Sequence, residues 1–360
     1  MRSEPLRICL VANSRFPIAE PFVGGLESMT WHLARELVRR GHEVAVFAAP
    51  HSDPALDVIE LSVHPVPSTH DGRHDLDAPP GVHVAEHHAY LSLMLDLARP
   101  GPPRFDVVHN NSLHHLPVAM AGILAVPLVT TLHTPPIPAL ASAIARGAGA
   151  STFTAVSEFI ARSWSHLVDS VCVPNGIDTD RWQAGPGGAN AVWSGRIVPE
   201  KAPHEAIDAA RRAGIPVVLA GPVLDRDYFE AEVVPRLGRE VTYAGHLDQG
   251  GLADLVGRSA VAIVTPVWDE PYGLVAAEAI ACGTPVAAYA RGGLPEVIHP
   301  RCGRLAPPGD TRLLAAAIQE ARLLDRDVVR RHAVEELSLQ RMVRGYEEVY
   351  ARLVDRGIAA

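Results

Sequence analysis

Hydrophobic and polar residues follow two alternating patterns along this chain. Short apolar runs rich in β-branched residues recur almost from end to end, and longer segments with a helical stripe lie between them. One stripe consists of Leu26, Met29, Leu33 and Leu37, and Gly41 stands where the helix would end. Strands and helices that alternate this regularly predict parallel sheets covered by helices on both faces.

The apolar runs predict ten strands, at residues 6–12, 44–47, 106–109, 127–133, 152–156, 191–194, 216–220, 241–243, 261–264 and 285–289. A chain of 360 residues is long for one hydrophobic core, so two sheets are expected. The seam is predicted at 174–176, before the glycine-rich stretch 183–190. We therefore expect an α/β protein with two Rossmann-like, doubly wound domains, 1–174 and 175–338. Ligands bind such sheets beyond the carboxyl ends of the strands, here in a cleft between the domains.

The composition excludes several classes of protein. Hydrophobic residues make up 48% of the chain and the net charge is −9, which argues against nucleic acid or an anionic membrane as the main partner. The four cysteines are far apart and form no CxxC pair, so we predict neither disulfides nor a zinc site, and a reducing cytoplasm is expected. The apolar run 8–12 is too short for a signal peptide. The uncharged stretch 116–132 contains two prolines and predicts a helix and a buried strand, not a membrane span.

Lys201 is the only lysine among the 32 basic residues. It lies in the segment AVWSGRIVPEKAPHEAI (191–207), five residues after Arg196 and just beyond a predicted strand. Two basic residues in a loop are often only solvated. However, an ammonium and a planar guanidinium together suit a phosphate group, and a lysine kept among arginines favours that function.

The segment WDEPYGLVAAEAIACGTPV (268–286) supplies a matching set of groups. A helix is predicted to start at about Gly273, and the N-terminus of a helix attracts phosphate. Glu278 would lie about 7 to 8 Å along that helix and lean back toward its start, within reach of a ribose. Glu270 would lie on the other side of the phosphates, where it could accept sugar hydroxyls. The alternative for Glu278 is a structural ion pair with an internal arginine.

Gly24 and Gly25 open the first predicted helix after a long loop. The pair only loosely resembles the dinucleotide-binding signature, because the glycine spacing differs and no acidic residue follows the second strand. An NAD enzyme is therefore disfavoured. A glycine pair that faces a phosphate across the cleft and a plain tight turn both remain open.

Aspartates and histidines give weaker signals. The pattern Asp-x-Asp starts at residues 75, 178, 225 and 325, and four unrelated hits show how little it discriminates. Asp225 is expected to cap a helix. Six histidines lie within 64–88, where a polar surface loop is favoured over a metal site. His109 and His133 each end a buried strand on the cleft side, and His133 is the stronger candidate for a ligand contact.

Five motifs together resemble the family 4 retaining glycosyltransferases of GT-B fold. They are GRIVPEK, EPYGLVAAEAIACGTPV with seven residues between its two glutamates, PNGID, RGGLPEVI and the early GGLE. Tyr272 stands where the family more often has phenylalanine. The resemblance covers nearly the whole chain and is strongest from residue 174 to 310.

The resemblance assigns a role to each candidate residue. Arg196 and Lys201 would neutralise the donor diphosphate, Glu278 would bind the ribose hydroxyls, and Glu270 would bind the donor sugar. The rest of the implied site consists of the backbone amides of Gly273, Leu274 and Val275, of Gly24 and Gly25 from the opposite domain, of His133 beside the sugar, and of Gly245, His246 and Leu247 near the base.

The resemblance also implies a reaction. It is a metal-independent transfer, without a cofactor, from a nucleotide-diphosphate sugar to an acceptor hydroxyl, with UDP as the expected nucleotide. The last helix, within 339–360, would cross back onto the first domain. The alternatives are a nucleotide-sugar epimerase or phosphorylase of similar shape and a binding protein without catalytic activity. A small-molecule acceptor is expected, with no transmembrane segment and no nucleic acid.

Overall fold

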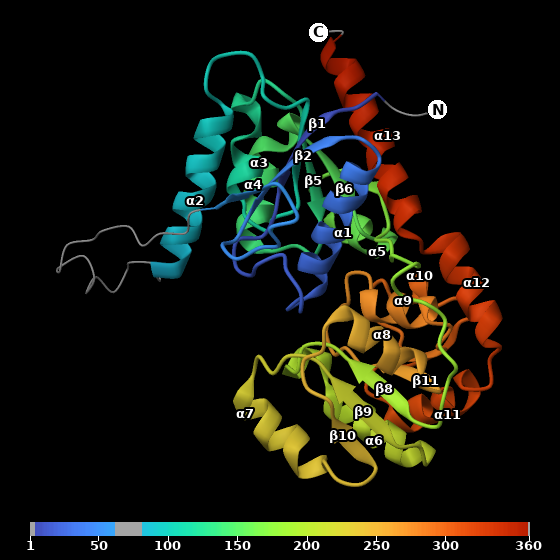
Figure 1. Cartoon of the computed structure of the whole chain (residues 1–360). Helices are drawn as coiled ribbons and strands as arrows, with labels where there is room; N and C mark the ends of the chain where they lie inside the picture. The colour runs from blue at the N-terminus through green and yellow to red at the C-terminus, as the bar shows by residue number, and fades with distance from the viewer. Residues whose placement is uncertain (1–3, 62–80, 359–360) are drawn as a thin grey trace, which may run out of the picture.

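The computed structural model describes residues 4–61 and 81–358, which form two lobes (Figure 1). The upper lobe contains a seven-stranded parallel sheet in the order β3-β2-β1-β4-β5-β6-β7. Its strands are β1 (Arg7–Val11), β2 (Glu43–Ala48), β3 (Val58–Glu60), β4 (Val107–Asn110), β5 (Leu128–Leu132), β6 (Ser151–Ala155) and β7 (Val171–Cys172). Its helices are α1 (Gly25–Arg39), α2 (Gly81–Leu97), α3 (Leu116–Ala119), α4 (Pro138–Gly147) and α5 (Glu158–Trp164).

The lower lobe contains a six-stranded parallel sheet in the order β10-β9-β8-β11-β12-β13. Its strands are β8 (Ala191–Ser194), β9 (Val217–Ala220), β10 (Val241–Tyr243), β11 (Val261–Val264), β12 (Val286–Tyr289) and β13 (Gly303–Ala306). Its helices are α6 (Pro203–Ala213), α7 (Arg226–Tyr228), α8 (Gln249–Gly257), α9 (Leu274–Ala281), α10 (Leu294–Val297), α11 (Thr311–Ala321) and α12 (Arg326–Glu336), followed by α13 (Leu339–Ile358). The predicted α/β fold with two doubly wound sheets is confirmed.

All ten predicted strands are present, and the three that the sequence pattern missed are β3, β7 and β13. Each of these three lies at an edge of its sheet. An edge strand is short and only partly covered, so it lacks the continuous apolar run of a central parallel strand. The predicted seam at 174–176 lies in the interval between β7 and β8.

Helix α13 returns from the lower lobe and packs along the upper one (Figure 1). Met342, Tyr346 and Tyr350 are buried in the core of the upper lobe. The Tyr350 hydroxyl lies 2.6 Å from Nδ1 of His109, which therefore has a structural partner inside the fold. The crossing of the last helix, which the family resemblance implied, is observed.

A second contact between the lobes involves the loop before α9. The Ser157 hydroxyl donates to the carbonyl of Pro271 at 2.6 Å. The carboxylate of Glu296 accepts the backbone N–H groups of Glu158 and Phe159 at 2.8 and 2.7 Å, in the first turn of α5. The lower lobe thus satisfies free N–H groups at the N-terminus of α5, and the bond from Ser157, the N-cap of α5, joins the loop before α9 to the same helix.

The histidine-rich segment differs from the expectation. Residues 62–80 lie outside the described part of the chain. Residues 81–88 form the first half of α2, so the prediction of a loop was wrong for them. Ala85, Ala89 and Leu93 continue one buried stripe along this helix, and that helical period extends the element back through the histidines.

Within the described ranges, no helix combines the length and the apolar character that a membrane crossing requires.

Candidate active site

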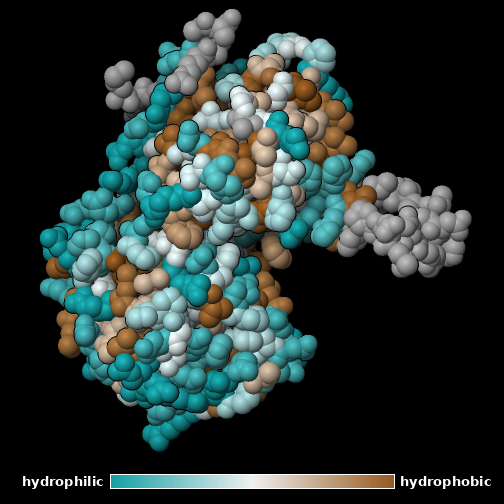
Figure 2. Space-filling view, turned by 180° about the vertical axis from the view of Figure 1, so that it is seen from behind, coloured by the Kyte–Doolittle hydropathy of each residue, from teal (hydrophilic) through white to brown (hydrophobic). Residues whose placement is uncertain are grey.

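A cavity of about 390 Å³ lies between the two lobes and is lined by both. Figure 2 shows the molecule from behind, with its surface hollowed at the level where the lobes meet. The predicted site residues on the cavity wall are Gly24, Gly25, His133, Arg196, Lys201, His246, Leu247, Glu270, Gly273, Leu274, Val275 and Glu278. The structure therefore brings together residues that are up to 254 positions apart in the sequence, from Gly24 to Glu278.

Gly245 is the one predicted site residue that does not line the cavity. Its carbonyl accepts the N–H of Gly221 at 2.9 Å, which connects the ends of two strands. The next residue, His246, donates from Nε2 to the carbonyl of Phe22 in the upper lobe at 3.0 Å. This segment therefore bridges the two walls of the cavity.

Lys201 and Glu270 form an ion pair at the cavity wall. Nζ of Lys201 lies 2.5 Å from Oε2 of Glu270, and the indole N–H of Trp268 donates to the same oxygen at 3.1 Å. The side chains of the pair are only 20% and 13% exposed. The sequence analysis had assigned these two groups to different parts of a ligand and did not foresee their contact. An ammonium has three donors, so the pair leaves two of them for an anion.

Arg196 follows β8 by two residues and also reaches the cavity. Across the described residues its guanidinium has no carboxylate within ion-pair distance, whereas Lys201 has one. The nearest acidic influence on it is Glu27 of the upper lobe, whose charge interacts with Arg196 without a direct ion pair. An arginine at the carboxyl end of a parallel strand that is not held in an ion pair is suited to bind a phosphate in a bidentate way. Arg196 and Lys201 thus provide two cations to one wall.

Helix α9 begins on the same wall. Its N-cap, Gly273, has φ +101°, and a Cβ added there would lie 2.4 Å from Cδ2 of Leu294. Only glycine fits both constraints without strain. The positive end of the α9 dipole lines the same cavity as Arg196 and Lys201, which makes this cavity a site for an anion.

Glu278 is buried one turn inside α9, with 9% of its surface exposed, and still reaches the cavity. Burial raises the pKa of its carboxyl group to about 7. In the described part of the chain no arginine, lysine or histidine pairs with it, so the predicted alternative of an internal ion pair is not observed. A buried carboxylate without a protein partner needs a hydroxyl or amide donor from elsewhere.

The motif RGGLPEVI (291–298) braces the loop that carries Glu270. Gly292 has φ +59°, and a Cβ added to it would lie 2.1 Å from the carbonyl oxygen of Glu270. The N–H of Gly293 donates to that same oxygen at 2.7 Å. This close backbone approach holds Glu270, and through it Lys201, at the cavity.

The upper lobe faces this wall with a glycine backbone and a neutral histidine, beside the ionisable side chains of Arg15 and Glu27. A Cβ added to Gly25 would lie 2.7 Å from Cδ1 of Leu274, so the start of α1 closely approaches the start of α9. Burial lowers the pKa of His133 to about 3, and its Nε2 donates to Oδ1 of Asn111 at 2.8 Å. His133 is therefore a neutral imidazole whose Nδ1 is an acceptor.

Several polar residues of the cavity were missed by the sequence analysis. Oγ1 of Thr134, Oδ1 of Asn175 and Oε1 of Gln249 are buried with no hydrogen-bond partner in the described ranges, and all three residues line the cavity. Glu27 also lines it, and burial raises the pKa of its carboxyl group. In the sequence, Glu27 appears only as the last letter of GGLE and Asn175 only as the second letter of PNGID, and Gln249 has no signal.

The Asp-x-Asp pairs within the described ranges have structural roles. Asp225 accepts the N–H of Tyr228 at the start of α7, and Asp325 accepts two N–H groups at the start of α12. Asp178 accepts the N–H groups of the residues two and three positions later. The fourth pair, at 75 and 77, lies outside the described residues.

Two doubly wound domains with such a site between them define a GT-B glycosyltransferase. The family profile "Glycosyltransferase Family 4" matches residues 23–181, and "Glycosyl transferases group 1" matches residues 179–335. The chain belongs to this glycosyltransferase family and is an enzyme of that class, as the sequence predicted.

Its relatives are named for different reactions. The chain is 30% identical over 353 residues to a D-inositol 3-phosphate glycosyltransferase of Gordonia bronchialis, covering 81% of this chain and 75% of the relative. It is 29% identical over 363 residues to a glycogen synthase of Mycobacterium tuberculosis, covering 87% and 85%. HepE of Anabaena, solved with UDP and glucose, has the same fold with a TM-score of 0.75 at 18% identity, over 96% of this chain and 99% of HepE.

Proposed function

We propose that this glycosyltransferase uses a nucleoside-diphosphate sugar as donor, needs no metal ion and retains the configuration of the anomeric carbon. One observation carries the proposal. Arg196, Lys201 and the start of α9 converge on a cavity whose wall also presents Glu270 and Glu278. UDP is the first nucleotide to test, because the HepE structure contains UDP and glucose. ADP is the second, because a starch synthase of the same fold was solved with ADP at a TM-score of 0.71.

The chemistry follows from where charge develops. The bond between the anomeric carbon and the diphosphate oxygen breaks, a bond to the acceptor oxygen forms, and the acceptor proton passes to the departing diphosphate. Negative charge grows on that diphosphate in the transition state, so fixed positive groups aimed at it accelerate the reaction. Arg196, Lys201 and the α9 dipole are such groups, and they would supply the charge that a metal ion supplies in other transferases.

The contacts of Glu270 support retention without a covalent intermediate. Its Oε2 is already held by Lys201 and Trp268. A carboxylate that is neutralised by an ammonium is a poor nucleophile but a good acceptor for sugar hydroxyls. We therefore infer that the acceptor attacks from the face that the diphosphate leaves, and that Glu270 orients the sugar.

Release of nucleoside diphosphate tests the donor assignment. Thermal shift against UDP, GDP and ADP and their glucose conjugates selects the nucleotide, because a ligand above its Kd stabilises the folded state. Glycogen and D-inositol 3-phosphate, named by the relatives, are the first acceptors to add. Release of diphosphate that rises with acceptor is expected. An epimerase would change the sugar without such release, and a binding protein would show the shift without turnover.

Chelation tests metal independence. Activity is expected to survive EDTA, since the two cations and the helix dipole act on the diphosphate directly. A loss of activity that Mg²⁺ or Mn²⁺ restores would contradict the proposal. The anomeric configuration of the product, read by NMR, tests retention separately.

A further inference from the structure

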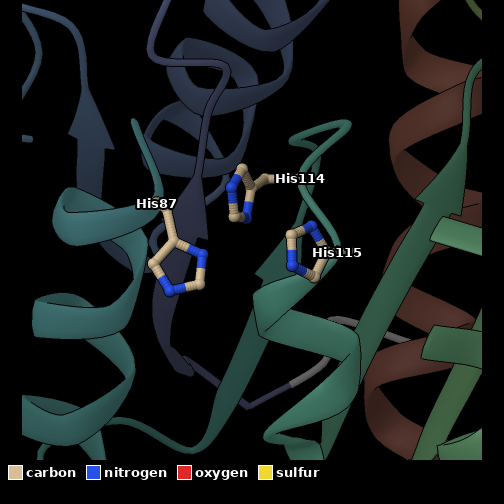
Figure 3. Close-up of side chains that lie close together, drawn as sticks. All are labelled: His87, His114 and His115. Carbon is tan, nitrogen blue, oxygen red and sulfur yellow. The ribbon is translucent and has the colours of Figure 1, made fainter. Parts of the chain in front are cut away.

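A cluster of three histidines lies on the upper lobe, outside the cavity wall described above. His87 projects from α2, and His114 and His115 lie in the loop that joins β4 to α3. One ligand atom of each residue lies within 4.8 Å of the other two. Figure 3 shows a ring nitrogen of each histidine facing the space between the three rings. Among the described residues, no other group of three histidines, cysteines or acids meets this spacing.

The central ring is held in place by its neighbours. His114 stacks on Tyr90 with ring centroids 4.5 Å apart, and on His115 with centroids 4.4 Å apart. The Tyr90 hydroxyl accepts the N–H of Ser14 and donates to the carbonyl of Ala12, both at 3.0 Å. His114 is thus held in position by a residue that is itself anchored to the segment just after β1.

The rings of His114 and His115 are stacked with 24° between their planes, so one of them must turn for both nitrogens to point at one ion. Nδ1 of His114 accepts the N–H of Leu116 at 3.2 Å. Neutral imidazoles are the commonest protein ligands of zinc and other divalent first-row metals.

The surrounding charges do not exclude a cation. Arg15 is the nearby positive group that acts on His114. Its guanidinium is paired with Glu86 through bonds of 2.8 and 3.3 Å, and the Glu86 side chain is only 8% exposed. The pair is locally neutral, so a divalent ion at the cluster would meet little net repulsion.

We propose that His87, His114 and His115 form a binding site for a divalent transition-metal ion, with Zn²⁺ as the probe. Two nitrogens that bind one tetrahedral zinc are about 3.3 Å apart, given Zn–N bonds of about 2.0 to 2.1 Å. The rings must therefore approach each other slightly, and His87, which is exposed on α2, is free to rotate. Binding through Nδ1 of His114 would replace its long bond from Leu116. Three nitrogen ligands leave a position for water.

The position of the three histidines indicates which part of the cavity wall a bound metal ion would affect. Leu113, which lines the cavity, immediately precedes His114. A metal bound by all three histidines would tie α2 to the loop that carries Leu113. It would leave the donor groups of the lower lobe unchanged, because none of the three rings lines the cavity.

Zinc titration of the full chain, without an affinity tag, tests the proposal. The wild type is expected to bind one Zn²⁺ per chain in calorimetry, with an affinity at least tenfold higher than that of His87→Gln. His88→Gln is the matched control, because His88 is a neighbouring exposed histidine of the same helix that is not in the cluster. Equal affinity of the wild type and His87→Gln, or no binding by the wild type at 100-fold excess zinc, would overturn the proposal.

Two further readouts locate the ion. Co²⁺ should give visible absorption bands with the wild type and His88→Gln, and the bands should be lost in His87→Gln and in His115→Gln. Lys201→Ala, which changes the donor cavity, should leave the zinc affinity unchanged. A tenfold loss of zinc affinity in that variant would place the ion in the donor cavity and contradict the assignment to the histidines.

Discussion

The two lobes contribute different chemistry to the same cavity. The lower lobe provides most of the ionisable groups, namely Arg196, Lys201, Glu270 and Glu278, whereas the upper lobe provides a close glycine backbone, a neutral His133 and buried polar side chains, with Arg15 and Glu27 as its ionisable residues. A leaving diphosphate carries charge at its reacting oxygen, and the hydroxyl group that attacks the sugar carries none. The difference between the walls is therefore what a donor side and an acceptor side would require.

Three of the charged groups of the lower wall lie near element ends or have a braced backbone. Lys201 directly precedes the N-cap of α6, Glu278 lies one turn into α9, and Glu270 is braced through its backbone by Gly293. The corresponding residues of the upper wall lie mainly in loops after strands. Side chains that a helix or a braced loop positions keep their geometry more readily than side chains in free loops. The donor side can therefore stay the same for different sugars, whereas changes in the loops of the upper lobe can alter which acceptor binds.

Loss of Lys201 should have the largest effect. Lys201→Ala removes a fixed cation from the developing charge, and we expect kcat to fall about 10²- to 10³-fold. Arg258→Ala is the matched control, because Arg258 is a basic residue of the same lobe, pairs with Asp254 at 2.7 Å and does not line the cavity. Initial rates of nucleoside diphosphate release measure both variants.

Binding experiments show whether Lys201 acts on the phosphates. UDP affinity should fall far more than uridine affinity in Lys201→Ala. If UDP and uridine lost affinity equally, Lys201 would not bind the phosphates. The assignment of the diphosphate to the lower wall would then be wrong. Lys201→Arg should recover binding only in part, because a planar fork does not replace a compact ammonium.

Glu278 gives the next largest effect. In Glu278→Gln we expect donor affinity to fall about 10- to 100-fold, the range for hydrogen bonds to a charged group. Burial raises the pKa of the wild-type carboxyl group to about 7, and ribose hydroxyls bind best to its ionised form. The wild-type affinity for UDP-glucose should therefore rise from pH 6 to pH 8, and that of Glu278→Gln should not. If the affinity of Glu278→Gln depended on pH in the same way as that of the wild type, the pH dependence would come from another titrating group.

The same group links stability to pH. The folded state binds this proton more tightly than the unfolded state, whose pKa is near 4.5, so the free energy of unfolding falls as pH rises from about 4.5 to about 7 and then levels off. The loss attributable to Glu278 has an upper bound of about 3 kcal/mol. Urea unfolding at pH 5 and pH 8 should show a steeper decline for the wild type than for Glu278→Gln. If the free energy of unfolding fell by the same amount in both proteins, ionisation of Glu278 would not destabilise the folded state.

Sequence reasoning succeeded where local patterns decide and failed where distant segments meet. Buried central strands have apolar runs, whereas edge strands such as β13 lack a distinctive one. The loop with the only lysine and the helix with two glutamates were both recognisable, but the ion pair of Lys201 and Glu270 joins residues 69 positions apart. His87 and His114 likewise meet only because α2 packs beside the loop after β4.

The approach of Gly25 to Leu274 offers a test of how closely the walls cooperate. Alanine at position 25 favours the helix α1, so Gly25→Ala should not destabilise the fold. Its Cβ would press on Cδ1 of Leu274, and the displaced walls should lower kcat/KM about 10- to 30-fold. The double variant Gly25→Ala/Leu274→Ala should recover part of that loss. Additive losses in the double-mutant cycle would show that the two residues do not interact during catalysis.

The smallest effect is expected for Glu27, on the upper wall. Its carboxyl group is buried and lines the cavity, where we expect it to accept a hydrogen bond from the acceptor hydroxyl. Glu27→Gln keeps the size and removes the charge, so transfer to the acceptor should fall only about 2- to 10-fold. Slow hydrolysis of the donor by water should remain at the wild-type rate, because the diphosphate groups of the lower wall are intact. Chromatography that separates glycosylated acceptor from free sugar measures both rates in one reaction. If Glu27→Gln reduced hydrolysis and transfer equally, Glu27 would belong with the donor groups, and the division of labour between the lobes would fail at this residue.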